Sequence, residues 1–164
     1  MADFTVRRCG TEDGAMLRHL RLAMLEQDAR SFNVDAEATR TKGVAWWEEW
    51  VREASEASSK VVVFALNGEV GVGMVAAHVE DGVVNTGALW VEPLHRGKRV
   101  AGALLSGVET WAHDVGATTI ELSVAEWNKG ALGLYDKHYY IDTGRRLPTR
   151  FGHRELVLAK QVGF

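Results

Sequence analysis

The sequence predicts an α/β fold in which a mixed, mostly antiparallel central sheet of about seven strands is flanked by four helices. Three observations predict it. Segments with an apolar period of two and of 3.6 follow one another in the order β-α-α-β-β-β-α-β-α-β-β. Two dipeptides that favour two-residue hairpin turns, Asn67-Gly68 and Asp81-Gly82, join three consecutive strands. With 164 residues, 46% of them hydrophobic, the chain fits one domain, residues 1–164, with a sizeable core.

The amino-terminal part begins with a short strand at residues 4–8 and a turn at 11–14 that leads into a helix. This helix is expected to reach about residue 30, and residues 31–41 are expected to be polar and irregular. A second helix follows at 41–57. Its apolar residues share one face: Trp47, Trp50, Val51 and Ala54.

Three strands, at 60–66, 70–80 and 83–92, form an antiparallel meander. A helix at 97–115 comes next because its apolar residues keep helical spacing, and Gly116 is a suitable residue to end it. The remaining elements are a strand at 118–124, a helix at 128–138 and strands at 140–145 and 153–160.

Composition excludes several classes of partner. The formal net charge of -3 gives no bulk attraction to nucleic acid or to an anionic membrane, so a basic site must be local. No apolar run approaches the roughly 20 residues that a membrane span needs. Cys9 is the only cysteine and is expected to be a small core residue, and the segment 1–4 lacks the pattern of a signal peptide. We therefore expect a soluble, cytoplasmic protein.

The most informative segment is residues 91–101, Val-Glu-Pro-Leu-His-Arg-Gly-Lys-Arg-Val-Ala, which passes from an apolar strand through a basic loop into a helix. The first amides of a helix are unpaired and point outward, so this junction suits a diphosphate group. Arg96, Lys98 and Arg99 supply local positive charge. Their spacing alone would also fit a solvated run of charge, but the strand before and the helix after favour a site for a nucleotide cofactor.

The element order and this segment resemble the GNAT acyltransferase superfamily over nearly the whole chain. The motif of that family is Gln or Arg, two variable residues, Gly, one variable residue, then Gly or Ala. Arg96 and Ala101 fit it, whereas Arg99 stands where glycine is usual, and its Cβ narrows the allowed backbone geometry. Charge-assisted bonds from arginine to phosphate oxygens can compensate in part. The resemblance implies acetyl-CoA as cosubstrate, no metal, and a set of cofactor-binding residues: Val91, Arg96, Gly97, Lys98, Arg99, Val100, Ala101, Asn128 and Ala131.

A second block, residues 128–137, resembles the family's Asn-x-x-Ala-x-x-x-Tyr-x-Lys helix. Asn128, Ala131 and Tyr135 share one helix face. In the family the asparagine contacts the pantetheine arm and the tyrosine hydroxyl lies near the thioester sulfur. The resemblance thus makes Tyr135 the general acid, and a phenol of pKa about 10 can protonate a departing thiolate. Without the resemblance, a packed helix tyrosine would be the default interpretation. Tyr139 replaces the glycine that is usual in the turn after this helix.

The resemblance also implies direct attack of an amine on the acetyl carbonyl and a backbone amide that stabilises the oxyanion. By position this amide is that of Leu89, with Val91 pairing the pantetheine amide, in a strand splayed from its neighbour. We therefore expect a V-shaped gap between strands four and five, at 83–92 and 118–124.

The sequence leaves the base that deprotonates the amine open. His78 and Glu80 point to one face of a strand and are weak candidates, Glu26 is a weaker one, and a water could serve instead. A surface or packing role for His78 is the alternative.

The acceptor pocket is also left open. Trp46, Trp47 and Trp50 exceed what one narrow buried stripe accommodates, so at least one of them can line it; core packing plus a dimer contact is the alternative. Acidic loop residues could attract a cationic amine or simply be wet surface: Asp28, Asp35 and Glu37.

These observations favour an acetyl-CoA-dependent N-acetyltransferase that acts on a primary amine of a small molecule in a ternary complex. Two alternatives are kept: a protein N-terminal or lysine acetyltransferase, and a catalytically silent acyl-CoA-binding regulatory module. The expected partner is a small-molecule amine, with no nucleic acid or membrane. A homodimer is left open, and the sequence does not name the acceptor because acceptor walls vary within one fold.

Overall fold

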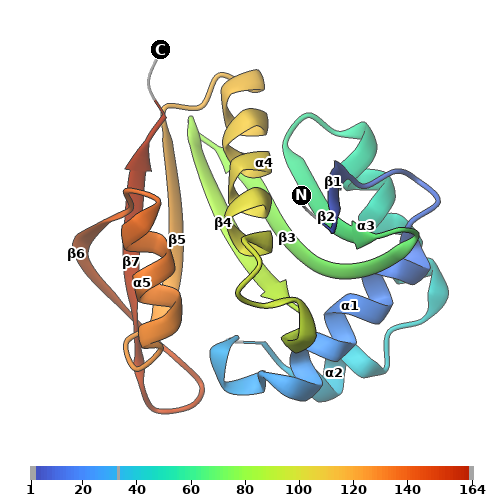
Figure 1. The fold of residues 1–164 in the computed structure, drawn as a ribbon, viewed down its shortest axis with the longest axis horizontal. Coiled ribbons are helices and arrows are strands. Elements are labelled where there is room, and N and C mark those ends of the chain that lie inside the picture. Colours follow the sequence, from blue (N-terminus) through green and yellow to red (C-terminus); the bar gives the residue numbers. More distant parts are fainter. Residues whose placement is uncertain (1–2, 33, 163–164) are drawn as a thin grey trace.

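The computed structural model describes residues 3–32 and 34–162. Its centre is a seven-stranded sheet in the order β1-β2-β3-β4-β5-β7-β6, in which β4 and β5 are parallel and all other neighbours antiparallel (Figure 1). This confirms the predicted mixed sheet and its meander. The strands are β1 (Thr5–Arg8), β2 (Lys60–Asn67), β3 (Val70–Glu80), β4 (Val83–Val91), β5 (Thr119–Ala125), β6 (Ile141–Pro148) and β7 (Arg154–Gln161).

Helices cover both faces of the sheet (Figure 1). Side chains of α1 and α3 pack with Phe64 and Met74 on one face, and those of α4 and α5 pack with Val63 and Ile120 on the other. Strand β2 is buried on both sides, as its continuous apolar run requires. The helices are α1 (Gly14–Gln27), α2 (Ala36–Arg40), α3 (Val44–Glu56), α4 (Val100–Asp114) and α5 (Lys129–Lys137), with short 3-10 turns η1 (Ala29–Ser31) and η2 (Pro93–His95).

The sequence predicts four flanking helices, and residues 3–32 and 34–162 form five. The prediction of an irregular segment at 31–41 is wrong over α2, because Asp35 caps this short helix by accepting a hydrogen bond from the amide of Ala38 at 3.0 Å. Helix α1 also ends earlier than predicted, at Gln27, and the chain continues as η1. None of the helices in the described ranges is both long enough and apolar enough to span a membrane.

Strands β4 and β5 separate part-way along their length. They pair at only four positions, from Val83 opposite Thr119 to Thr86 opposite Leu122. Beyond this point the register between β3 and β4 shifts, and Ala88 takes a left-handed conformation with φ 55°. A bulge bends a strand away from its neighbour, so the predicted gap between strands four and five is present.

Candidate active site

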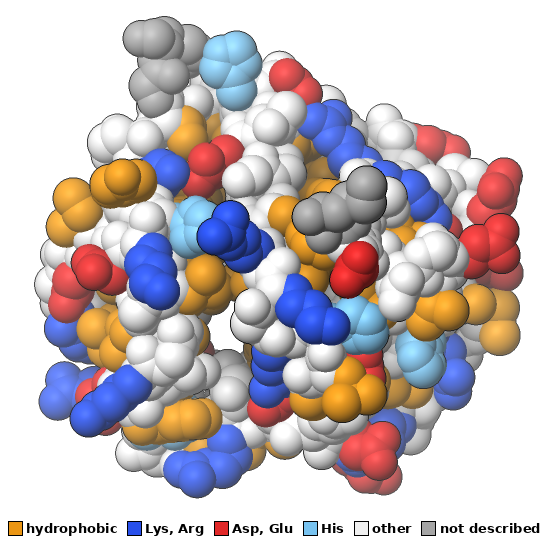
Figure 2. All heavy atoms as spheres, in the orientation of Figure 1, with side chains coloured by type: hydrophobic (Ala, Val, Ile, Leu, Met, Phe, Trp, Pro, Cys, Tyr) orange, Lys and Arg blue, Asp and Glu red, His pale blue; other side chains and the backbone are white. Residues whose placement is uncertain are grey.

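Two pockets meet at the split between β4 and β5. The first, here called the α4–α5 pocket, is bordered by Ala101 of α4 and Leu134 of α5 and has a volume of about 1010 Å³. The second, the α1–α3 pocket, is bordered by Arg21 of α1 and Trp50 of α3 and has a volume of about 590 Å³. Figure 2 shows the surface hollowed between the half with α5 and β7 and the half with α4, with Lys and Arg side chains on both sides. Because helices on opposite faces of the sheet border the two pockets, groups held in each can meet through the split. The residues shared by both pockets are Ser31, Phe32, Leu89, Asn128, Ala131 and Tyr135.

The amino terminus of α4 opens into the α4–α5 pocket. Arg99 precedes the helix at φ 67° and ψ 17°, the left-handed conformation that glycine adopts without strain. The amides of residues 100–102 come before the bond from the Ala103 amide to the Arg99 carbonyl, at 3.2 Å, so they have no partner within the helix. This arrangement suits an anion.

Most of the predicted cofactor-binding residues line this pocket, and Lys98 does not. Lys98 lies on a separate surface hollow beside His95 and Asn67. The residues that the structure brings together in the α4–α5 pocket are Val91, Arg96, Gly97, Arg99, Val100, Ala101, Asn128 and Ala131.

The Arg96 side chain ties the loop before α4 to the end of α1. Its Nε donates to the Val91 carbonyl and its Nη2 to the Asp28 Oδ2, each at 2.8 Å. The same carboxylate oxygen accepts a hydrogen bond from the Trp90 Nε1 at 2.8 Å. Asp28 therefore holds the loop before α4 in place, and its carboxylate is already occupied by these two donors. This argues against its predicted role of attracting a cationic amine. Asp35, the cap of α2, has a structural partner as well.

Tyr135 lies at the junction of the two pockets and is only 8% exposed. It is held two turns from Asn128, whose Oδ1 caps α5 by accepting from the Ala131 amide at 3.1 Å. The ring packs edge-on against Tyr140, with centroids 5.9 Å apart. Burial raises the pKa of the Tyr135 phenol, so the hydroxyl stays protonated at neutral pH and can donate a hydrogen bond, although it is a weaker acid than a free phenol.

Leu89 lies on the bulged part of β4. Val75 faces two residues there, Ala88 and Leu89, neither of which has a partner in the register with β3. The Leu89 backbone therefore lies outside the regular ladder, at the place where both pockets meet.

The two predicted base candidates lie in different places. His78 is exposed and lines the α1–α3 pocket beside Asn85, whereas Glu80 is exposed at the end of β3 and lines neither pocket. Glu155, which is not among the residues predicted from the sequence, is a carboxyl only 7% exposed that lines the α1–α3 pocket from β7. Burial raises the pKa of this carboxyl, while a hydrogen bond with Ser123 and the nearby His153 partly oppose the rise.

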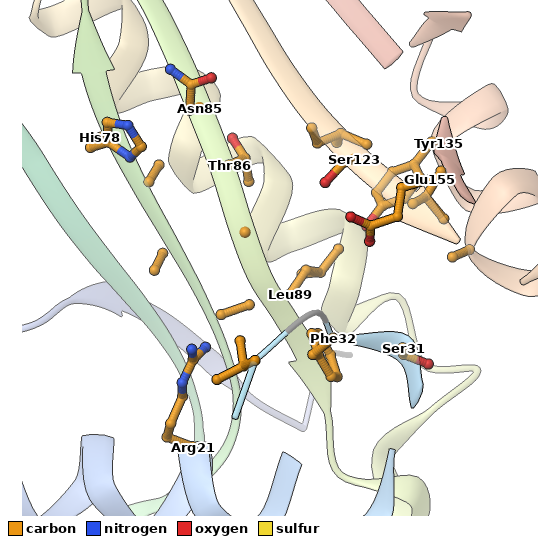
Figure 3. Close-up of a pocket in the computed structure, with 18 of the residues that line it drawn as sticks. Arg21, Ser31, Phe32, His78, Asn85, Thr86, Leu89, Ser123, Tyr135 and Glu155 are labelled. Carbon is orange, nitrogen blue, oxygen red and sulfur yellow. The ribbon is translucent and has the colours of Figure 1, made fainter. Parts of the chain in front are cut away.

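A sequence signal for Glu155 does exist. Glu155 alternates with Leu156 along β7 and shares a face with the buried Val157. An acidic residue on a buried strand face is uncommon unless it has a partner or a function. Figure 3 shows Ser123, Tyr135 and Glu155 on the side of the hollow that faces β4.

Arg21 is the second residue that the sequence analysis missed. It lines the α1–α3 pocket, four residues after the buried Leu17 and on the same stripe. Its guanidinium lies over the Trp50 ring, 5.3 Å from the centroid. The three tryptophans thus have different roles: Trp47 is core, Trp50 is a pocket wall, and Trp46 is 41% exposed.

A comparison with protein families identifies the fold. The model of the acetyltransferase (GNAT) family matches residues 21–139. The chain belongs to the GNAT acetyltransferase family. This confirms the resemblance drawn from the two sequence blocks, and with it the assignment as an acyltransferase. No curated protein matches the chain by sequence.

Solved structures agree with this fold over almost the whole chain. An acetyltransferase of the GNAT family from Streptococcus pneumoniae has a TM-score of 0.85 and 17% identity, covering 98% of this chain and 99% of that one. The structure of yncA from Salmonella typhimurium, with its cofactor acetyl-CoA, has a TM-score of 0.74 and 19% identity over 98% and 95%. A chimera of the Vibrio cholerae spermidine N-acetyltransferase SpeG and hSSAT has a TM-score of 0.76 and 14% identity over 98% and 96%.

The site also bears on metal binding. Within residues 3–32 and 34–162, no three or more His, Cys, Asp or Glu side chains are grouped so that they could hold a metal ion.

Proposed function

We propose that this protein transfers the acetyl group of acetyl-CoA to a primary amine of a small molecule by direct attack in a ternary complex. The observation that carries the proposal is that the α4–α5 and α1–α3 pockets meet at Leu89 and Tyr135. Two reactants can then approach the same point from opposite faces of the sheet, which an acyl transfer without a covalent enzyme intermediate requires.

The α4–α5 pocket fits a coenzyme A thioester. The free amides at the start of α4 and the exposed Arg99 suit a diphosphate, and the split beside the β4 bulge leads from there to Tyr135. The yncA neighbour, which was solved with acetyl-CoA, supports this assignment. When bound, the thioester supplies the activated acetyl group.

Leu89 and Tyr135 act on different atoms of the thioester. The Leu89 amide donates a hydrogen bond to the carbonyl oxygen as negative charge develops on it. The amine nitrogen forms a bond to the acetyl carbon, the carbon–sulfur bond breaks, and Tyr135 donates its proton to the departing sulfur. The amine loses one proton to a base and the sulfur gains one from Tyr135, so the reaction neither consumes nor releases a proton overall.

We assign the role of base to Glu155 and not to His78. Both line the α1–α3 pocket, but Glu155 is buried on the side of the pocket that also carries Tyr135, and burial raises its pKa, which makes it a stronger base than an ordinary carboxylate. His78 is exposed at the far end of the hollow beside Asn85 (Figure 3). The variants Glu155→Gln and His78→Ala test separately whether each side chain is the base.

A small acceptor suits the α1–α3 pocket better than a protein segment does, because about 590 Å³ is the size of a small-molecule site. The buried Tyr135 at the junction argues against a silent binding module.

The test is a titration with acetyl-CoA followed by thiol-release assays with a panel of amines. We expect specific binding of acetyl-CoA over ATP, and a loss of turnover by a factor of about ten to a thousand in Tyr135→Phe without a matching loss of affinity. Tyr140→Phe is the matched control, since this neighbouring buried tyrosine lines neither pocket. Unchanged turnover in Tyr135→Phe would refute the role of the phenol, and no acetyl-CoA binding up to about a millimolar would refute the donor assignment.

A further inference from the structure

Arg21 is a charged residue in a largely enclosed position without an anionic partner. It belongs to the stripe of α1 that carries Leu17 and Leu20 into the core. In the described part of the chain its Nε is inaccessible to solvent and has no hydrogen-bond partner. No carboxylate in that part contributes to its electrostatic environment, and burial alone lowers its pKa, to about 10.

Folding stability does not explain this arrangement. With a pKa of about 10 the guanidinium remains charged at neutral pH, and a charge partly removed from water without a counter-ion is unfavourable. The contact with the Trp50 ring, at 5.3 Å, restrains the side chain and returns only part of that cost. A hydrophobic residue at this position of α1 would not carry this penalty, so stability does not account for the charge.

The direction of the side chain indicates a use for the charge. Figure 3 shows Arg21 extending from α1 toward the hollow of the α1–α3 pocket, with Leu89 between it and the side that carries Glu155. Phe32 and Val34 supply apolar walls of the same pocket, and the Thr86 Oγ1 is a second buried polar atom without a partner in the described residues. The pocket therefore offers a cation at one end, a carboxyl at the other and the reaction point between them.

We propose that Arg21 binds a carboxylate of the acceptor, so that the acceptor is an amino acid or a closely related amine that carries a carboxylate. A guanidinium donates two parallel hydrogen bonds to a carboxylate, which would satisfy the unpartnered donors of Arg21. The amine of the same molecule then lies toward Glu155 and Leu89. A polyamine such as spermidine would instead bring a second cation against Arg21, which is unfavourable. This inference rests on the proposed N-acetyltransferase activity.

Matched pairs of amines test the inference. Leucine, methionine and phenylalanine are compared with the amines that result from their decarboxylation, and spermidine is added as a polycation. Thiol release from acetyl-CoA gives kcat and KM for the native protein, Arg21→Gln and Arg21→Lys. Arg18→Gln is the matched control, because Arg18 lies on the same helix, is exposed and lines neither pocket.

We expect at least one amino acid to be preferred over its decarboxylated partner. Arg21→Gln should raise the KM for that amino acid by about tenfold or more, in keeping with a lost bond to a charged group, and should leave the KM for the partner amine unchanged. Arg21→Lys should recover part of the loss, and Arg18→Gln should have no effect. The inference is overturned if the decarboxylated amines or spermidine are acetylated as well as the amino acids, or better, in every case. It is also overturned if Arg21→Gln changes the KM of both members of a pair alike. In either case the proposed acetyltransferase function stands.

Melting curves in the presence of coenzyme A keep the two hypotheses distinguishable. If no amine is acetylated, the proposed function fails, and Arg21 is then judged by binding alone. A rise in melting temperature with the amino acids that is absent with the decarboxylated amines and lost in Arg21→Gln supports carboxylate binding. An equal response to both members of each pair, or none, refutes it.

Discussion

Replacement of Arg99 by glycine separates the conformational cost of this residue from its charge. Arg99 lies at φ 67° and ψ 17°, in the left-handed region that costs a non-glycine residue about 1–2 kcal/mol. Glycine removes this cost but loses more backbone freedom on folding, about 0.5–1 kcal/mol. We expect Arg99→Gly to raise the free energy of unfolding by about 0.5–1 kcal/mol, which for a chain of this length is a rise in melting temperature of about 1–4 °C.

Arg99→Ala is the control for this effect. Alanine keeps a Cβ in the left-handed region but removes the guanidinium, which is exposed and caps nothing. Its free energy of unfolding should stay within about 0.5 kcal/mol of the native value. The strain argument is refuted if Arg99→Gly melts at or below the temperature of Arg99→Ala.

Calorimetric titration with acetyl-CoA measures the charge separately. Both variants lose a charge-assisted contact of about 1.5–3 kcal/mol, so Kd should rise by about ten- to a hundredfold. Glycine lets the backbone approach the phosphates more closely, and Arg99→Gly should therefore bind more tightly than Arg99→Ala. The native advantage should shrink as salt is added, because salt screens an exposed charge. Equal Kd values for all three proteins at low salt would show that Arg99 does not contact the phosphates.

Three further results are expected. Tyr139→Gly should raise the melting temperature, because Tyr139 lies at φ 68° and is exposed; a fall would show that the contact of Lys160 with its ring outweighs the strain. Gly102→Ala places a Cβ 2.9 Å from the His138 Nε2, so the helix-propensity gain of about 1 kcal/mol should appear only together with His138→Ala, and melting of the single and double variants checks this. Glu155→Gln should stabilise the fold at neutral pH, because a raised pKa means that the charged carboxyl costs stability there. The gain should shrink as the pH falls through the pKa of the native carboxyl toward 4.5, the ordinary value, and disappear below it. A gain that persists unchanged at pH 4 would contradict this, and thiol release by the same variant should fall by about a hundredfold if Glu155 is the base.

Local patterns were sufficient for the elements that bury a regular apolar face. The hairpin turn at Asp81 and Gly82, both at positive φ, follows from the dipeptide itself, and the stripe of α4 follows from its spacing. Helix α2 was missed because its five residues are too few for a period and only the Asp35 cap marks its start.

Arg21 and Glu155 could not be placed from local patterns. Periodicity places each side chain on the inward side of its element. It does not show whether that side chain lies at the split in the sheet. That depends on β7 lying between β5 and β6, and on α1 lying beneath the β4 bulge, which are properties of the whole topology. The motif residues were easier, because Asn128 and Tyr135 lie on one short helix whose internal geometry the sequence determines.

Two positions where the family usually has glycine, Arg99 and Tyr139, show how the backbone of the site is maintained. Both are left-handed, so the chain keeps the path that glycine would take and accepts the strain. Both side chains are exposed, and the fixed points are their buried neighbours: Val100 is 2% exposed, and Tyr140 is 4% exposed with its amide bonded to the Tyr135 carbonyl at 3.0 Å. Core packing one residue later therefore imposes the turn in each case. Two such costs of about 1–2 kcal/mol each are a large share of a typical stability of 5–15 kcal/mol. The packing of Val100 and Tyr140 must therefore contribute more stability than these two turns lose.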